Sequence, residues 1–222
     1  MSQLTLVIGN KNYSSWSLRP WLALRMAGLD FAEERIPLYG PGSRDAILCH
    51  SPAGRVPILH DGDVTIWDSL AICEYVAELA PHAGLWPDDR ATRAQARAIS
   101  AEMHAGFTAL RTAMPMNLRL DGARLAAPPS PEVEADIARI VAIFEECRMR
   151  HGAAGDFLFG SFTIADAMYA PVATRLRSYS VPLPARSRAW VDALWSLAPM
   201  QEWAAAGVAE VERIALYETH VR

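Results

Sequence analysis

The segment with the most chemical potential is NKNYSSWSLRPW, residues 10–21. Directly after Tyr13 it carries three serines: Ser14, Ser15 and Ser17. A proline is tolerated in the first turn of a helix, so Pro20 predicts that a helix begins near residues 15–17. The serines would then lie at the helix N-terminus, where free N–H groups and the macrodipole favour an anion.

Two interpretations of this segment stay open at this point. The simpler one is an N-cap, in which one serine hydroxyl satisfies the first helical N–H groups. Capping needs a single hydroxyl, however, and the segment offers three beside that of Tyr13. A thiolate could accept hydrogen bonds from the remaining hydroxyls, since a helix N-terminus can lower the pKa of a thiol well below its free value of about 8.5.

A second candidate is GRVPILHDG, in which Pro57 follows Val56 at the start of an apolar run. Proline cannot donate a ladder hydrogen bond, so Pro57 belongs at a sheet edge or at a special turn with a cis peptide. A cis bond would leave the N–H and C=O of Val56 free to pair with an extended, peptide-like ligand.

A third candidate is WDSLAICEYV, where a strand ends and Asp68 and Ser69 open a helix. Both residues are typical helix caps. They could also hold a ligand that has a carboxylate and an ammonium, with Ser69 and nearby N–H groups binding the carboxylate and Asp68 the ammonium.

The elements that must position these residues follow from the apolar pattern. Residues 4–8 read as a buried strand, and apolar residues from Leu18 to Leu29 recur at helical spacing. The order continues with a strand at 31–38, a long connection at 39–54, a hairpin turning at Asp61 and Gly62, and a helix over 72–79. The first eighty residues therefore predict a strand, helix, strand, hairpin and helix.

After a boundary between Pro81 and Pro87, helical patterns replace every strand signal. Apolar residues step by three or four from Ile99 to Met114, and again from Val133 to Phe144. The second of these helices has Ser130 as N-cap and Pro131 at its first position, and it is expected to stop at residues 151–152. The pair Thr163 and Asp166 predicts a capping box, and helices from Ser187 and over residues 200–206 finish the chain.

Composition excludes several classes of function. The 222 residues carry a net charge of −4 and no basic run, which argues against a nucleic-acid partner. Neither a signal peptide nor a membrane-length apolar stretch is found, so we expect a cytoplasmic protein. The P-loop, dinucleotide, zinc-protease and serine-hydrolase motifs are all absent from the sequence.

Cysteine and histidine usage does not indicate a metal. Three cysteines without CxxC spacing, Cys49, Cys73 and Cys147, suggest neither a disulfide framework nor a zinc site. The histidines have no cluster spacing, so we expect no metal: His50, His60, His82, His104, His151 and His220.

With these segments in order, the chain resembles the cytosolic glutathione S-transferase family over nearly its full length. GRVPILHDG is similar to the family's cis-proline segment, DSLAICEYVAE to its γ-glutamyl-binding segment, and SFTIADAMYAPV to the capping-box segment of its C-terminal domain. The resemblance implies an α/β thioredoxin-like, glutathione-binding domain over residues 1–82. An all-α helical-bundle domain would then cover residues 87–222.

The resemblance also implies roles for single residues. Ser14 would donate a hydrogen bond to the glutathione thiolate, with Ser15 as the competing choice and Tyr13 as a weaker contender. The glutathione site would comprise Ser14, Ser15, Trp16, Arg55, Val56, Pro57, Asp68 and Ser69. SSWSLRPWLAL resembles the zeta-class stretch, but Trp16 occupies the position of its cysteine. This departure puts the maleylacetoacetate-isomerase activity of that class in doubt and leaves a serine-type transferase intact.

The implied partners are reduced glutathione, as a co-substrate and not a prosthetic group, a small hydrophobic electrophile, and a second copy of the chain in a homodimer. The electrophile pocket would involve His104, Phe107 and Arg111, although this Met-rich stripe is more typical of a core. Alternatives on the same scaffold are an isomerase acting on maleylacetoacetate or maleylpyruvate, a peroxidase, and a non-catalytic interaction module. A thiol-disulfide oxidoreductase is weaker, since the cysteines lie outside the serine segment.

Overall fold

The structure is a computed structural model that describes residues 3–123, 125 and 127–219. Its N-terminal domain contains a mixed sheet with the strand order β2-β1-β3-β4. The strands are β1 (Leu4–Ile8), β2 (Phe31–Arg35), β3 (Ile58–Asp61) and β4 (Val64–Ile66). β1 runs parallel to β2 and antiparallel to β3, and β3 forms the predicted hairpin with β4.

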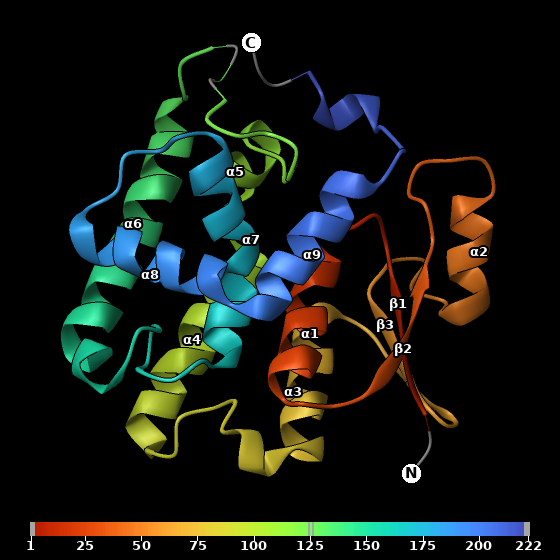
Figure 1. Cartoon of the computed structure of the whole chain (residues 1–222), viewed down its shortest axis with the longest axis horizontal. Coiled ribbons are helices and arrows are strands. Elements are labelled where there is room, and N and C mark those ends of the chain that lie inside the picture. The colour runs from red at the N-terminus through yellow and green to blue at the C-terminus, as the bar shows by residue number, and fades with distance from the viewer. Residues whose placement is uncertain (1–2, 124, 126, 220–222) are drawn as a thin grey trace.

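The alternation of side chains along β1 explains why helices cover both faces of the sheet. Leu6 and Ile8 point to one face and join the main core with α1 (Ser15–Met26) and α3 (Ser69–Leu79). Val7 points to the opposite face, where it packs in a smaller cluster with Ile47 of α2 (Ser43–His50). α2 lies apart from the other helices, on the far side of the sheet (Figure 1).

Two local predictions in this domain need correction. The long connection at 39–54 contains α2, whose eight residues and single buried side chain leave too weak an apolar pattern to be recognised. The helix start at Ser15 agrees with the prediction, but Pro20 is the sixth residue of α1 and so lies in its second turn. At that position the missing N–H removes one helical hydrogen bond, which tertiary packing must offset.

Helices joined by loops make up the described part of the C-terminal domain, with isolated β-bridges at Phe157–Gly160 and Phe159–Ser161. Its helices are α4 (Arg90–Ala105), α5 (Thr108–Ala113), α6 (Pro131–His151), α7 (Ile164–Ser178), α8 (Ala185–Ser196) and α9 (Ala198–Ala209). α7 is buried along nearly its whole length, and α4, α6 and α8 pack against it together with α1. Three helix-end predictions are confirmed: the Ser130 cap, the stop at His151, and the capping box of Thr163 and Asp166.

The predicted single helix from Ile99 to Met114 is wrong, because the chain breaks after Ala105 into α4 and α5. A Cβ on Gly106 would lie 2.8 Å from the carbonyl oxygen of Glu102, and Phe107 has a positive φ of 57°. Pro115 lies after the end of α5.

The two domains share one continuous core. α1 packs against both α7 and α9. The indole rings of Trp21 and Trp203 meet edge to face across this interface, with their centroids 5.1 Å apart. Among the described helices, none combines the length and the hydropathy needed to cross a membrane.

Candidate functional site

The N-terminus of α1 lies largely buried at the domain interface, and we call it the open helix end because two of its first N–H groups have no partner among the described residues. Ser14 is the N-cap residue, yet its side chain accepts no capping hydrogen bond. Among the described residues, no acceptor is found for the N–H groups of Trp16 and Ser17, so the helix end presents free donors. The capping interpretation is therefore wrong for the Ser14 side chain.

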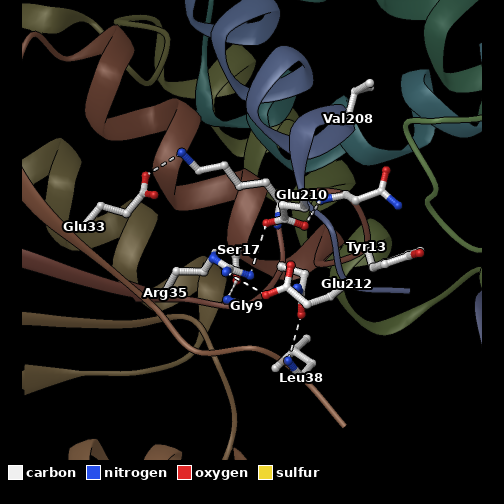
Figure 2. A network of polar contacts seen from close by, with 12 residues as sticks. Gly9, Tyr13, Ser17, Glu33, Arg35, Leu38, Val208, Glu210 and Glu212 are labelled. Atoms are coloured by element: carbon white, nitrogen blue, oxygen red, sulfur yellow. Dashed lines mark hydrogen bonds and ion pairs between the residues drawn. The ribbon is translucent and has the colours of Figure 1, made fainter. Parts of the chain in front are cut away.

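The Ser14 hydroxyl belongs to a short hydrogen-bonded chain instead. Its Oγ lies 2.7 Å from Oγ of Ser17, which accepts a hydrogen bond from the backbone N–H of Gly9 at 3.1 Å. Figure 2 shows Gly9 and Ser17 at the end of β1 and the start of α1. Ser14 is 5% exposed, so this contact is shielded from bulk water.

Ser15 faces a different group. Its Oγ accepts a hydrogen bond of 3.3 Å from Nη2 of Arg175, a buried residue of α7. The other guanidinium nitrogens of Arg175 donate to the carbonyl oxygens of Met114 and Pro171. Ser15 thus links the start of α1 to the C-terminal domain.

The Tyr13 hydroxyl points away from the open helix end. It donates to the carboxylate of Glu218 and accepts from Arg119 at 3.0 Å and from the N–H of Ile214 at 3.4 Å. Burial, followed by the hydrogen bond to Glu218, raises the pKa of Tyr13. These contacts speak against the weaker expectation that Tyr13 contacts a thiolate.

Trp16 is half-buried between charged groups. The guanidinium of Arg19 lies 4.2 Å from the centre of its indole, and that of Arg111 lies 5.2 Å away. His104 meets the same indole edge to face at 5.3 Å. An aromatic ring suits this position, because its π face attracts both cations.

Arg19 is the least satisfied charged group of the site. It is 1% exposed, and its Nε and Nη1 atoms have no hydrogen-bond partner among the described residues. Burial, with the nearby charges of Arg175 and Arg111, lowers the pKa of Arg19 to about 9. Burial and Arg111 likewise lower the pKa of Arg175 to about 10, so both guanidinium groups are charged at neutral pH.

Sequence reasoning missed Arg19 and Arg175. A usable signal existed for Arg19, which stands among apolar residues of α1 such as Leu18, Trp21 and Leu22. A charge in such a position is rarely buried unless it is paired. Arg175 offered no such signal, since its role depends on how α7 packs against α1.

The second sequence candidate has the expected backbone geometry. The bond between Val56 and Pro57 is cis, and no described residue forms a hydrogen bond with the N–H or C=O of Val56. Val56 is half-buried, Pro57 is buried, and Arg55 is exposed. The backbone of Val56 is thus available to an extended ligand.

The third candidate lies at the start of α3. One carboxylate oxygen of Asp68 accepts the N–H groups of Leu70 and Ala71 at 3.0 and 3.4 Å, and the other lies 2.8 Å from Nε2 of His104. The Oγ atom of Ser69 is buried and lacks a partner among the described residues. One oxygen of Asp68 thus caps α3 and the other pairs with His104, while the Ser69 hydroxyl is unpaired among the described residues.

The residues expected in an electrophile pocket are only partly together. His104 and Arg111 both contact Trp16, and Nη1 of Arg111 donates to the carbonyl oxygen of His104. Phe107, in contrast, is 7% exposed and packs in the main core.

The three cysteines belong to α2, α3 and α6 and not to the serine segment. Burial raises the pKa of the Cys73 and Cys147 thiols, that of Cys147 to about 12, while Cys49 is exposed on α2. Within the described residues, no group of three or more His, Cys, Asp or Glu side chains could hold a metal ion. His220 lies outside the described residues.

A thioredoxin-like sheet with an open serine turn and a cis-proline turn, followed by a helical domain, defines the fold class of the glutathione transferases. Family models agree: that of the glutathione S-transferase N-terminal domain matches residues 13–79, and that of the C-terminal domain matches residues 93–206. The chain belongs to the glutathione S-transferase family.

Curated relatives match over shorter stretches. Glutathione S-transferase 1 of Dianthus caryophyllus is 40% identical over 82 residues, which cover 36% of this chain and 37% of that protein. A probable maleylacetoacetate isomerase of Caenorhabditis elegans is 37% identical over 98 residues, 44% of this chain and 45% of that protein. The matches therefore span less than half the length of either relative.

Solved structures match over nearly the whole chain. A Burkholderia glutathione transferase homologue with bound glutathione has a TM-score of 0.71 at 24% identity, covering 94% of this chain and 100% of its own. Glutathione transferase Omega 2S of Trametes versicolor has a TM-score of 0.72 at 18% identity, covering 98% and 99%. At these identities the likeness establishes the fold.

Proposed function

We propose that this protein is a glutathione transferase that binds reduced glutathione as its thiolate at the N-terminus of α1. The observation that carries the proposal is the open helix end, where the free N–H groups of Trp16 and Ser17 lie beside the Ser14 hydroxyl. Such a site favours the charged form of a thiol, and so lowers its pKa. The thiolate then attacks an electrophilic carbon, and no residue of the protein needs to act as a covalent nucleophile.

The hydrogen-bonded chain favours Ser14 over Ser15 as the thiolate contact. The N–H of Gly9 donates to Ser17, whose hydroxyl can donate to Ser14 across 2.7 Å. The Ser14 proton is then free to point at the sulfur. Each donor in such a chain polarises the next, which strengthens the last hydrogen bond of the chain.

The rest of glutathione would extend along the two other candidate segments. The free backbone groups of Val56 would pair with the cysteinyl residue in the manner of a β-strand. Ser69, whose hydroxyl is unpartnered, would bind the γ-glutamyl carboxylate, and Asp68 its ammonium. Arg55 is exposed and would reach the glycyl carboxylate. Pro57 sets the turn, and Trp16 lines the site beside the sulfur.

The proposal is tested on the wild-type protein. Calorimetry should detect binding of reduced glutathione, and ultraviolet absorbance should reveal a bound thiolate near neutral pH. S-methylglutathione is the matched control, because it should bind but cannot produce the thiolate signal. A protein that shows neither binding nor thiolate absorbance is not a glutathione transferase.

A second candidate is a glutathione-dependent isomerase whose substrate carries a carboxylate, and the buried Arg19 favours it. An uncompensated buried cation is costly, so a site that contains one is suited to an anion. Arg175 and Arg111 add positive charge on the side of the C-terminal domain. A carboxylated electrophile would meet this charge while its reacting carbon faces the thiolate.

Substrate comparison separates the two candidates. The panel contains maleylacetoacetate, maleylpyruvate, a peroxide and an uncharged aryl halide. If the second candidate holds, Arg19→Met lowers kcat/KM for the carboxylated substrates by about ten-fold or more and spares the aryl halide. Because the pKa of Arg19 is lowered to about 9, activity with carboxylates should also decline as pH rises through that value. Equal losses for every substrate would exclude a carboxylate-binding role for Arg19.

Two further parts of the proposal concern partners. His104 and Arg111 would face the second substrate beside Trp16, and Phe107 would support that wall from the core. A homodimer and a small hydrophobic electrophile complete the proposed partners. Light scattering tests whether the protein is a homodimer, and the substrate panel tests whether it accepts a small hydrophobic electrophile.

A further inference from the structure

The loop of residues 11–13, which leads directly into the serine turn, forms several hydrogen bonds with the C-terminal domain. The N–H groups of Lys11 and Asn12 donate to the two carboxylate oxygens of Glu210, at 2.7 and 3.2 Å. The carbonyl oxygen of Lys11 accepts a hydrogen bond of 3.0 Å from the indole N–H of Trp203. The backbone of this loop thus depends on residues that follow the last long helix or belong to it.

Two side chains of the same loop also contact the C-terminal domain, whereas Nζ of Lys11 forms an ion pair of 2.8 Å with Glu33 of β2 (Figure 2). The amide nitrogen of Asn12 donates to Oδ1 of Asn117 at 2.9 Å. The hydroxyl of Tyr13 contacts Glu218 and Arg119. Every residue of the loop is therefore bonded to the C-terminal domain.

Glu210 is the centre of this arrangement (Figure 2). Its side chain is 7% exposed, and besides the two N–H groups it lies 3.7 Å from Nη1 of Arg35 on β2. Arg35 is held independently by Glu212 at 2.8 Å, so its charge does not rely on Glu210. The carboxylate of Glu210 is thus committed chiefly to the loop.

The loop in turn sets where Ser14 lies. The N–H groups of Tyr13 and Ser14 both donate to the carbonyl oxygen of Asn10, at 3.1 and 2.8 Å, which closes a tight turn over the loop. Ser17 lies within α1 and is bonded to Gly9, which directly follows β1, so neither residue belongs to the loop. A shift of the loop would therefore change the distance between Ser14 and its partner Ser17.

We propose that Glu210 is a positioning residue for the serine turn, through which the C-terminal domain sets the alignment of Ser14 with the bound sulfur. This inference rests on the proposed function. The two N–H groups of the loop need a two-oxygen acceptor, and a carboxylate provides it at this spacing.

The test compares Glu210→Gln with Glu212→Gln. The glutamine keeps the shape but offers only one acceptor oxygen, so one N–H of the loop loses its bond. Glu212→Gln removes the same charge from the same segment, while the Glu212 side chain forms no bond to residues 11–13. The measured quantities are the pKa of bound glutathione, from thiolate absorbance against pH, with kcat, KM and the melting temperature.

The direction in which the thiol pKa of bound glutathione shifts distinguishes a positioning role of Glu210 from a direct effect of its charge. Removing a negative charge near a thiolate lowers the pKa of the thiol, whereas misplacing Ser14 raises it. We expect Glu210→Gln to raise the thiol pKa by about one unit and to lower kcat about ten-fold with little change in KM for glutathione. Glu212→Gln should leave the thiol pKa unchanged or slightly lowered.

Other outcomes overturn the inference. An unchanged or lowered thiol pKa in a folded Glu210→Gln protein would show that Glu210 does not position Ser14. An equal rise of the thiol pKa in Glu212→Gln would also show that the effect is not specific to Glu210. If Glu210→Gln does not fold, Glu210→Asp keeps the charge but shortens the reach of the carboxylate to the N–H groups of Lys11 and Asn12, and an unchanged thiol pKa there contradicts the inference. Absence of a thiolate in the wild type would overturn the proposed function itself.

Discussion

Ser14 and Ser15 are adjacent, but their hydroxyls contact different groups, which allows their roles to be separated. Ser14 joins Ser17 at the open helix end, whereas Ser15 accepts a hydrogen bond from Arg175. We expect Ser14→Ala to keep glutathione binding but to lose the thiolate signal near neutral pH, with kcat/KM reduced about a hundred-fold. Isothermal calorimetry checks that glutathione still binds, and ultraviolet absorbance checks that the thiolate signal is lost.

Ser15→Ala serves as the comparison. It frees one guanidinium nitrogen of Arg175 without touching the bonded pair of Ser14 and Ser17, so the pKa of bound glutathione should change little. A loss of thiolate in Ser15→Ala, with Ser14→Ala unaffected, would reverse the assignment.

Some residues of the candidate site could be predicted from sequence, and others could not. The serines, Pro57 and the Asp68-Ser69 pair were recognisable because each follows from a local rule about helix ends or proline. Arg175 and Glu210 were not, since each meets the serine turn from the opposite end of the chain. Nothing in the spacing of residues predicts that kind of contact.

At the scale of single elements, the start of α7 is the clearest case for a stability prediction. Asp166 is buried and accepts hydrogen bonds from the N–H groups of Leu158 and Thr163, the Thr163 hydroxyl and the indole of Trp190. Asp166→Ala should reduce the free energy of unfolding by about 3 kcal/mol or more, because several buried donors lose their acceptor. Thr163→Ala removes the cap hydroxyl and only one of the hydrogen bonds to Asp166, so it should cost about 1 kcal/mol. Urea denaturation of both variants measures the difference, and equal costs would mean that the buried donors find other acceptors.

Elements with strong local signals were predicted well, and those without them were not. β1, the hairpin, α3 and the ends of α6 carry apolar periodicity, a turn dipeptide or explicit caps. α2 lacks such a pattern, and its stability depends on the one side chain, Ile47, that it buries against the sheet. The break between α4 and α5 was missed because apolar residues keep helical spacing across Gly106.

For the whole molecule, the shared core predicts cooperative unfolding. α1 belongs to the N-terminal domain by sequence but packs against α7 and α9 of the C-terminal domain, so neither domain retains its core alone. We expect one thermal transition, with the same midpoint by far-ultraviolet circular dichroism and by tryptophan fluorescence. Two separated midpoints would show that the domains are stable independently.

The contact between Trp21 and Trp203 has a further, spectroscopic consequence. Two indoles held edge to face at a centroid distance of 5.1 Å are close enough for their electronic transitions to couple. Such exciton coupling adds paired bands of opposite sign to the circular dichroism spectrum and vanishes when the rings separate. Trp21 belongs to α1 and Trp203 to α9, so the pair is a built-in optical reporter of domain separation that requires no added label.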